Sequence, residues 1–213
     1  MKAYIQKNII PILIEVAFIL SFLFVPEEYA VYTNFVFYSA LAVYFGTKRA
    51  FSLKAWKNQL SSGKDFWSAV FWTGVFFMIA FGFTGVLEGM FPNVDTGMIG
   101  LRRSNWLELV LFAASTVFLP PVVEELFYRQ SLISFKNKGW MIATALFSTF
   151  LFALEHALKP FGILITAIWA LPLVVAYIKT KNIYVPMTAH FIANAIGNGS
   201  TVIIMAIKLM EKG

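Results

Sequence analysis

The chain of 213 residues is 59% hydrophobic and 17% aromatic, and only 13% of its residues are charged. A soluble domain usually carries about 25% charged residues, and one of this size cannot hide so much apolar surface from water. The net charge of +6 comes from basic residues scattered through short segments, which argues against a nucleic-acid partner, and the absence of cysteine excludes a thiol nucleophile. We therefore expect one integral membrane domain, covering 1–213, with the lipid bilayer as its solvent.

Apolar runs of about 17–25 residues predict membrane-spanning helices, and seven such runs follow one another along the chain. In chain order they cover 9–25, 30–46, 66–90, 105–134, 140–158, 161–179 and 184–208. The first run follows two lysines, as in a signal peptide, but it is long and no A-x-A-like cleavage site follows it. The predicted fold is all-α: a polytopic transmembrane helical bundle of about seven spans, with a catalytic core in the C-terminal four.

The lysines and arginines predict the orientation of these spans. With the N-terminus in the cytoplasm, eleven of the 17 basic residues fall in cytoplasmic segments, five fall on the other side, and Arg129 lies within a span. Lysine and arginine accumulate on the cytoplasmic side of membrane proteins. We therefore expect an integral protein of the cell membrane with a cytoplasmic N-terminus and an outer C-terminus.

The stretch "VVEELFYRQS" at 122–131 places three charged residues in an otherwise apolar run. An ionisable side chain at the bilayer centre costs about 2.5–3.5 kcal/mol on insertion scales. Glu125 and Arg129 stand at i and i+4, so they share a helical face and can neutralise each other. Glu124 is rotated by about 100° from Glu125 and suits a general base. The alternative is a helix end near the interface, where the three charges are simply solvated.

The only two histidines also lie in apolar runs. "FALEH" places Phe152 and His156 at i and i+4, and "HFIAN" does the same for His190 and Asn194. A lone intramembrane histidine is more often a hydrogen-bond partner between helices than a catalyst. The sequence contains no H-E-x-x-H zinc motif, no G-x-S-x-G motif and no aspartate within a span. The remaining chemistry is water activation by glutamate and histidine, with histidine and asparagine as donors to an oxyanion.

Together the three motifs "EELFYR" (124–129), "FALEH" (152–156) and "HFIAN" (190–194) resemble the signature of the CPBP family. This family of CAAX proteases and bacteriocin-processing enzymes is also called the Abi family. The resemblance covers roughly 105–200, which we expect to be the catalytic core. Residues 1–104 hold the N-terminal spans and the cytoplasmic loop and carry no matching motif.

The resemblance implies an intramembrane endopeptidase that hydrolyses a peptide bond of a membrane-associated peptide or protein. It implies that a glutamate and a histidine activate the water, and that a histidine and an asparagine stabilise the oxyanion. An ion pair and a packed phenylalanine would support them. Glu124 and His156 would activate the water, and His190 and Asn194 would stabilise the oxyanion. Glu125 and Arg129 would form the ion pair, and Phe152 would be the packed phenylalanine.

The resemblance also bears on cofactors and on competing functions. The family was once regarded as zinc-dependent and now resembles a metal-free glutamate protease, so we expect no metal. Zinc is the minority alternative, because two histidines and two glutamates could ligate it. Competing functions are a bacteriocin self-immunity protein or a non-catalytic membrane scaffold of the same family, and an ion-coupled transporter. Transporters often contain internal repeats, and this sequence shows none.

Overall fold

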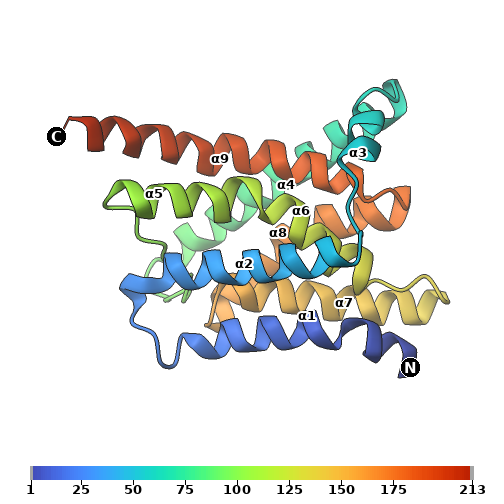
Figure 1. The fold of residues 1–213 in the computed structure, drawn as a ribbon, viewed down its shortest axis with the longest axis horizontal. Helices are drawn as coiled ribbons and strands as arrows, with labels where there is room; N and C mark the ends of the chain where they lie inside the picture. The colour runs from blue at the N-terminus through green and yellow to red at the C-terminus, as the bar shows by residue number, and fades with distance from the viewer. Residues whose placement is uncertain (1, 212–213) are drawn as a thin grey trace. The chain divides into compact units, whose positions relative to one another are not determined.

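The computed structural model describes residues 2–211, and this part of the chain is helical with no β-strand. The all-α prediction is therefore confirmed (Figure 1). The α-helices are α1 (Lys2–Ser21), α2 (Ala30–Thr47), α3 (Leu53–Leu60), α4 (Lys64–Met90), α5 (Trp106–Ala113), α6 (Pro120–Glu124), α7 (Lys138–His156), α8 (Pro160–Thr180) and α9 (Tyr184–Met210). A short 3₁₀ turn, η1 (Glu27–Tyr29), precedes α2, and two π-helical segments, η2 (Ala114–Phe118) and η3 (Glu125–Ser131), flank α6.

Five helical segments of the described residues are long and apolar enough to cross a membrane. They cover Tyr4–Ser21, Lys64–Met90, Trp106–Ser131, Pro160–Thr180 and Tyr184–Met210. Helices α2 and α7 occupy the places of the two remaining predicted spans, with 18 and 19 residues. They are not among the five because amide, hydroxyl and charged side chains interrupt their apolar sequence. The membrane class is confirmed, whereas the count of seven spans is not.

The chain forms two compact units. Unit 1 comprises Met1–Phe51, Gly100–Glu124 and Phe191–Gly213, and unit 2 comprises Ser52–Ile99 and Glu125–His190. Each unit therefore combines segments from both sides of residue 104, and the expectation of a single membrane domain stays a prediction. Two of the unit boundaries fall inside helical segments, at the Glu124–Glu125 and His190–Phe191 peptide bonds.

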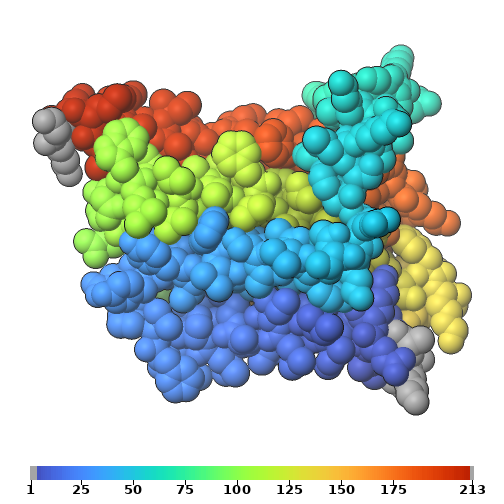
Figure 2. Space-filling view, in the orientation of Figure 1, coloured from blue at the N-terminus to red at the C-terminus, as the bar shows by residue number. Residues whose placement is uncertain are grey.

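In unit 1, α1 and α2 lie side by side, and their side chains meet along both helices (Figures 1 and 2). The ring of Phe18 on α1 stacks on Phe37 of α2, with ring centroids 4.4 Å apart. A second face of α2 packs against the helical run from Trp106 to Glu124. The buried residues on α2 include a stripe at spacings of three and four, as a packed helix requires: Val31, Asn34, Tyr38, Leu41 and Phe45.

Two prolines interrupt the backbone hydrogen bonding of the run from Trp106 to Ser131. Pro120 and Pro121 have no N–H, so neither an α-turn nor a π-turn supplies a backbone donor to the carbonyl of Thr116. Asn194 and Asn198 of α9 fill this gap, since their Nδ2 atoms donate to Thr116 O at 2.9 and 3.2 Å. The neighbouring Ser115 O accepts from Nδ2 of Asn34 at 3.3 Å. Asparagine side chains of unit 1 thus replace the donors that the prolines lack.

In unit 2, α8 packs against both α4 and α7. Trp169 of α8 donates from Nε1 to the hydroxyl of Thr84 on α4 at 2.8 Å, which ties the two helices together. Helix α3 begins at Ser52, whose hydroxyl accepts from the Ala55 N–H. Trp56 of α3 donates to the hydroxyl of Thr188 on α9 at 2.8 Å. Trp56 therefore anchors the short helix α3 between α2 and α4.

The segment that follows α4 fixes the end of α7. Ile99 N–H donates to the carbonyl of His156 at 3.0 Å, and Leu158 N–H donates to Gly97 O at 2.9 Å. This pairing needs glycine at position 97, because its φ is +60° and a Cβ there would lie 2.6 Å from the Lys159 side chain. A Cβ on Gly162 would lie 2.0 Å from the carbonyl oxygen of Thr96. The two glycines let the backbones approach closely just beyond His156.

Candidate active site

A buried cluster of charged and imidazole groups lies in unit 2. Arg129 Nε is 3.3 Å from Glu125 Oε2, and His190 Nδ1 is 2.9 Å from Glu125 Oε1. The three residues are at most 4% exposed. The Glu125 carboxylate therefore contacts both an arginine one helical turn away and a histidine 65 residues away. The i,i+4 spacing predicts the first contact, whereas no local pattern predicts the second.

Phe152 of α7 connects this cluster to His156. The Arg129 guanidinium lies over the Phe152 ring at 4.7 Å, and the imidazole of His156 stacks on the same ring with centroids 4.4 Å apart. The i,i+4 spacing of Phe152 and His156 on α7 places the two rings on one face. Unit 2 thus gathers Glu125, Arg129, Phe152, His156 and His190 into one continuous set of contacts.

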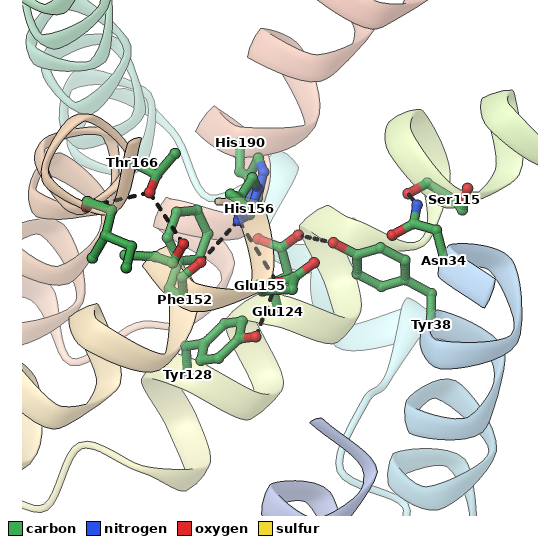
Figure 3. A network of polar contacts seen from close by, with 12 residues as sticks. Asn34, Tyr38, Ser115, Glu124, Tyr128, Phe152, Glu155, His156, Thr166 and His190 are labelled. Atoms are coloured by element: carbon green, nitrogen blue, oxygen red, sulfur yellow. Dashed lines mark hydrogen bonds and ion pairs between the residues drawn. The ribbon is translucent and has the colours of Figure 1, made fainter. Parts of the chain in front are cut away.

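The hydrogen bonds fix which ring nitrogen of each histidine carries the proton. His156 Nδ1 is 2.9 Å from the Phe152 carbonyl oxygen, and a carbonyl can only accept, so Nδ1 carries hydrogen (Figure 3). His190 Nδ1 lies against the Glu125 carboxylate, which also pairs with Arg129, so this nitrogen is assigned as the donor. In the neutral form, both imidazoles therefore present Nε2 as a hydrogen-bond acceptor. His156 is partly exposed, with 28% of its side chain accessible.

Glu155 belongs to the same neighbourhood, although it was not among the predicted site residues. Its Oε2 accepts from the Tyr128 hydroxyl at 2.9 Å and lies 3.9 Å from His156 Nδ1 (Figure 3). Ser148 ties the two segments together by donating to the Tyr128 carbonyl at 2.5 Å. Glu155 and His156 each offer a ligand atom that zinc accepts.

Glu124 ends α6 in unit 1 and is buried, with 1% of its surface exposed. The hydroxyl of Tyr38 on α2 donates to Glu124 Oε1 at 2.5 Å (Figure 3). Sequence reasoning missed Tyr38, because it is 86 residues from Glu124 and belongs to none of the motifs. The peptide bond between Glu124 and Glu125 keeps their Cα atoms about 3.8 Å apart.

Asn194 lies in unit 1, one helical turn beyond His190 on α9. It is half-buried, and its Nδ2 donates to Thr116 O. A side-chain amide carries two N–H groups, so this bond uses one of them. Asn198 makes the same contact without belonging to a predicted motif. The structure thus gives Asn194 a backbone-capping contact besides the oxyanion role expected from the sequence.

An apolar groove of about 640 Å³ runs between α4 and α8 of unit 2. Trp72, Phe76 and Leu171 are among its lining residues, and all three side chains are largely exposed. Lys179 in the last turn of α8 is its one charged lining residue. None of the predicted site residues lines this groove, so it is separate from the candidate active site.

These features define a helical integral membrane protein that keeps glutamate, arginine and histidine side chains buried within apolar helices. Residues 105–196 match the family model described as type II CAAX prenyl endopeptidase Rce1-like. The matched segment contains all three motifs, so the resemblance to the CPBP and CAAX proteases is confirmed over this range. The description that this family model carries is that of an endopeptidase. Comparison with curated proteins and with solved structures gave no match.

Proposed function

We propose that the chain is an intramembrane endopeptidase that uses water to hydrolyse a peptide bond of a membrane-associated substrate. The observation that carries this proposal is the family match over 105–196, because it includes every residue to which the sequence assigns chemistry. The family description makes a prenylated C-terminal CAAX peptide the substrate class to test first.

In this proposal Glu124 is the general base. Its carboxylate accepts a proton from water while the water oxygen attacks the carbonyl carbon of the substrate. The carbonyl π electrons move to oxygen and form a tetrahedral oxyanion. Glu124 then returns the proton to the amide nitrogen, the C–N bond breaks, and the products are an acid and an amine. His156 Nε2 accepts the second hydrogen of the water and orients it for attack, a role that its Nδ1 contact supports.

His190 and Asn194 are the proposed oxyanion donors. Since Nδ1 of His190 is bonded to Glu125, donation to an oxyanion from Nε2 requires the doubly protonated imidazolium. The Glu125 carboxylate contacts this imidazole through Oε1 and pairs with Arg129 through Oε2. Asn194 contributes its second amide hydrogen. A well-aimed oxyanion donor is typically worth about 2.7–4 kcal/mol in the transition state.

The test is cleavage of a farnesylated, fluorescence-quenched peptide ending in Cys-aliphatic-aliphatic-X by protein reconstituted in proteoliposomes. Glu124→Gln keeps the shape of the side chain and removes the base, so turnover should fall by at least about 100-fold. His156→Ala should lose activity to a similar degree. Glu108→Gln is the matched control, because Glu108 is a buried carboxylate on the same helical run, outside the motifs. Full turnover in folded Glu124→Gln protein would refute the proposal.

A further inference from the structure

The segment that precedes the family match supplies a direct contact to the proposed general base. Tyr38 lies on α2, outside the matched range of 105–196. Its side chain is 3% exposed, and its hydroxyl is 2.5 Å from Glu124 Oε1. A short bond to a carboxylate is typical of a charge-assisted hydrogen bond, in which the hydroxyl donates.

The position of α2 along its neighbouring helices places the Tyr38 hydroxyl against the Glu124 carboxylate. Asn34 stands one helical turn before Tyr38 and donates to Ser115 O. The Leu119 N–H, the α-helical donor for that carbonyl, bonds to Ala114 O instead, and Pro120, the next residue, has no N–H. The proline break therefore provides the anchoring point for Asn34, and the helical repeat carries Tyr38 to Glu124. Phe37 holds the other face of α2 against Phe18 of α1.

We propose that Tyr38 is a positioning residue for the general base Glu124, an inference that rests on the proposed function. The terminal torsion of a glutamate is otherwise broad, because rotation about the last bond meets little steric resistance. The hydroxyl of Tyr38 fixes this rotation by holding Oε1. Helices α1 and α2 of unit 1 thereby help to position the proposed general base and also contribute to the packing of the fold.

The prediction is specific to the hydroxyl group. Tyr38→Phe keeps the ring and its packing and should lower kcat by about 10- to 100-fold, the effect of losing a hydrogen bond to a charged group. KM for the farnesylated CAAX peptide should change little, because Tyr38 acts through Glu124. Tyr44→Phe is the matched control: it removes a hydroxyl from the same helix, one that donates to Lys7 O at 3.1 Å. This control should retain wild-type kcat.

The double variant Tyr38→Phe with Glu124→Gln separates positioning from general destabilisation. If Tyr38 acts through the carboxylate, removing its hydroxyl should not lower the residual hydrolysis of Glu124→Gln any further. Melting temperature and the folded fraction are measured on each preparation, so that a loss of folded protein is subtracted from the activity.

Three results would overturn the positioning role. Wild-type kcat in Tyr38→Phe, with Glu124→Gln inactive, would remove Tyr38 and leave the proposed function standing. An equal further loss in the Glu124→Gln background would show that Tyr38 acts independently of the carboxylate. Full turnover in Glu124→Gln would refute the proposed function, and the positioning role with it.

Discussion

Arg129→Ala tests the energetics of the buried cluster in unit 2. Arg129 and Glu125 are both fully buried, and their charged groups are 3.3 Å apart. Removing one partner of such a pair typically costs about 3–5 kcal/mol, because the other charge stays buried without compensation. The lost contact over Phe152 adds about 1 kcal/mol, whereas His190 still donates to Glu125 and offsets part of the cost. We take about 3 kcal/mol, near the lower end of that range.

For a chain of this length, about 3 kcal/mol corresponds to a fall in Tm of about 6–12 °C. Thermal unfolding in detergent measures this shift. Arg102→Ala is the control, because Arg102 is about half exposed and its contacts are long: 3.8 Å to Glu28, which is also about half exposed, and 3.9 Å to the buried Glu108. An exposed pair is worth at most about 1 kcal/mol. Adding Glu125→Gln to Arg129→Ala should recover part of the loss, since it removes the uncompensated carboxylate and keeps an acceptor for His190.

The reasoning would be refuted by two results. A wild-type Tm together with lost turnover would assign Arg129 to the reaction itself. A double variant no more stable than Arg129→Ala would show that the uncompensated charge is not the source of the cost.

Three further predictions concern Asn194, the metal content of the protein, and Asp95. Asn194→Ala should lower kcat by about 100- to 1000-fold with KM nearly unchanged. Asn198→Ala removes a donor from the same Thr116 carbonyl, so it should lower Tm about as much as Asn194→Ala does while kcat is retained. Equal kcat in the two variants would restrict Asn194 to capping Thr116. Elemental analysis of purified active protein should find no stoichiometric metal; zinc whose removal abolishes activity and whose return restores it would reverse this prediction. Outside the spans, the Lys159 ammonium and the Gly97 N–H hold the pKa of Asp95 below its ordinary value of 3.8, so its stabilising contribution is present above that value and disappears as the pH falls through the lower folded pKa. The Tm difference between wild type and Asp95→Asn should therefore be present at pH 7 and narrow below about pH 4; a constant difference would contradict this assignment.

The sequence alone determined the features that depend on local periodicity. Apolar runs long enough to cross a bilayer predicted the helices, because a backbone in lipid must satisfy its hydrogen bonds within the helix. The i,i+4 spacing predicted that Glu125 pairs with Arg129 and that Phe152 shares a face with His156, since 3.6 residues complete one helical turn. Both contacts are present. The three motifs also predicted the family to which residues 105–196 are matched.

Only the tertiary structure decided which helices supply the remaining partners. Tyr38 contacts Glu124 across 86 positions, His190 contacts Glu125 across 65, and Asn194 caps Thr116 across 78. Such contacts depend on how each helix is rotated about its axis and how far it is shifted along its neighbour. Side-chain packing sets both quantities, and a repeat of 3.6 residues within one helix carries no information about either.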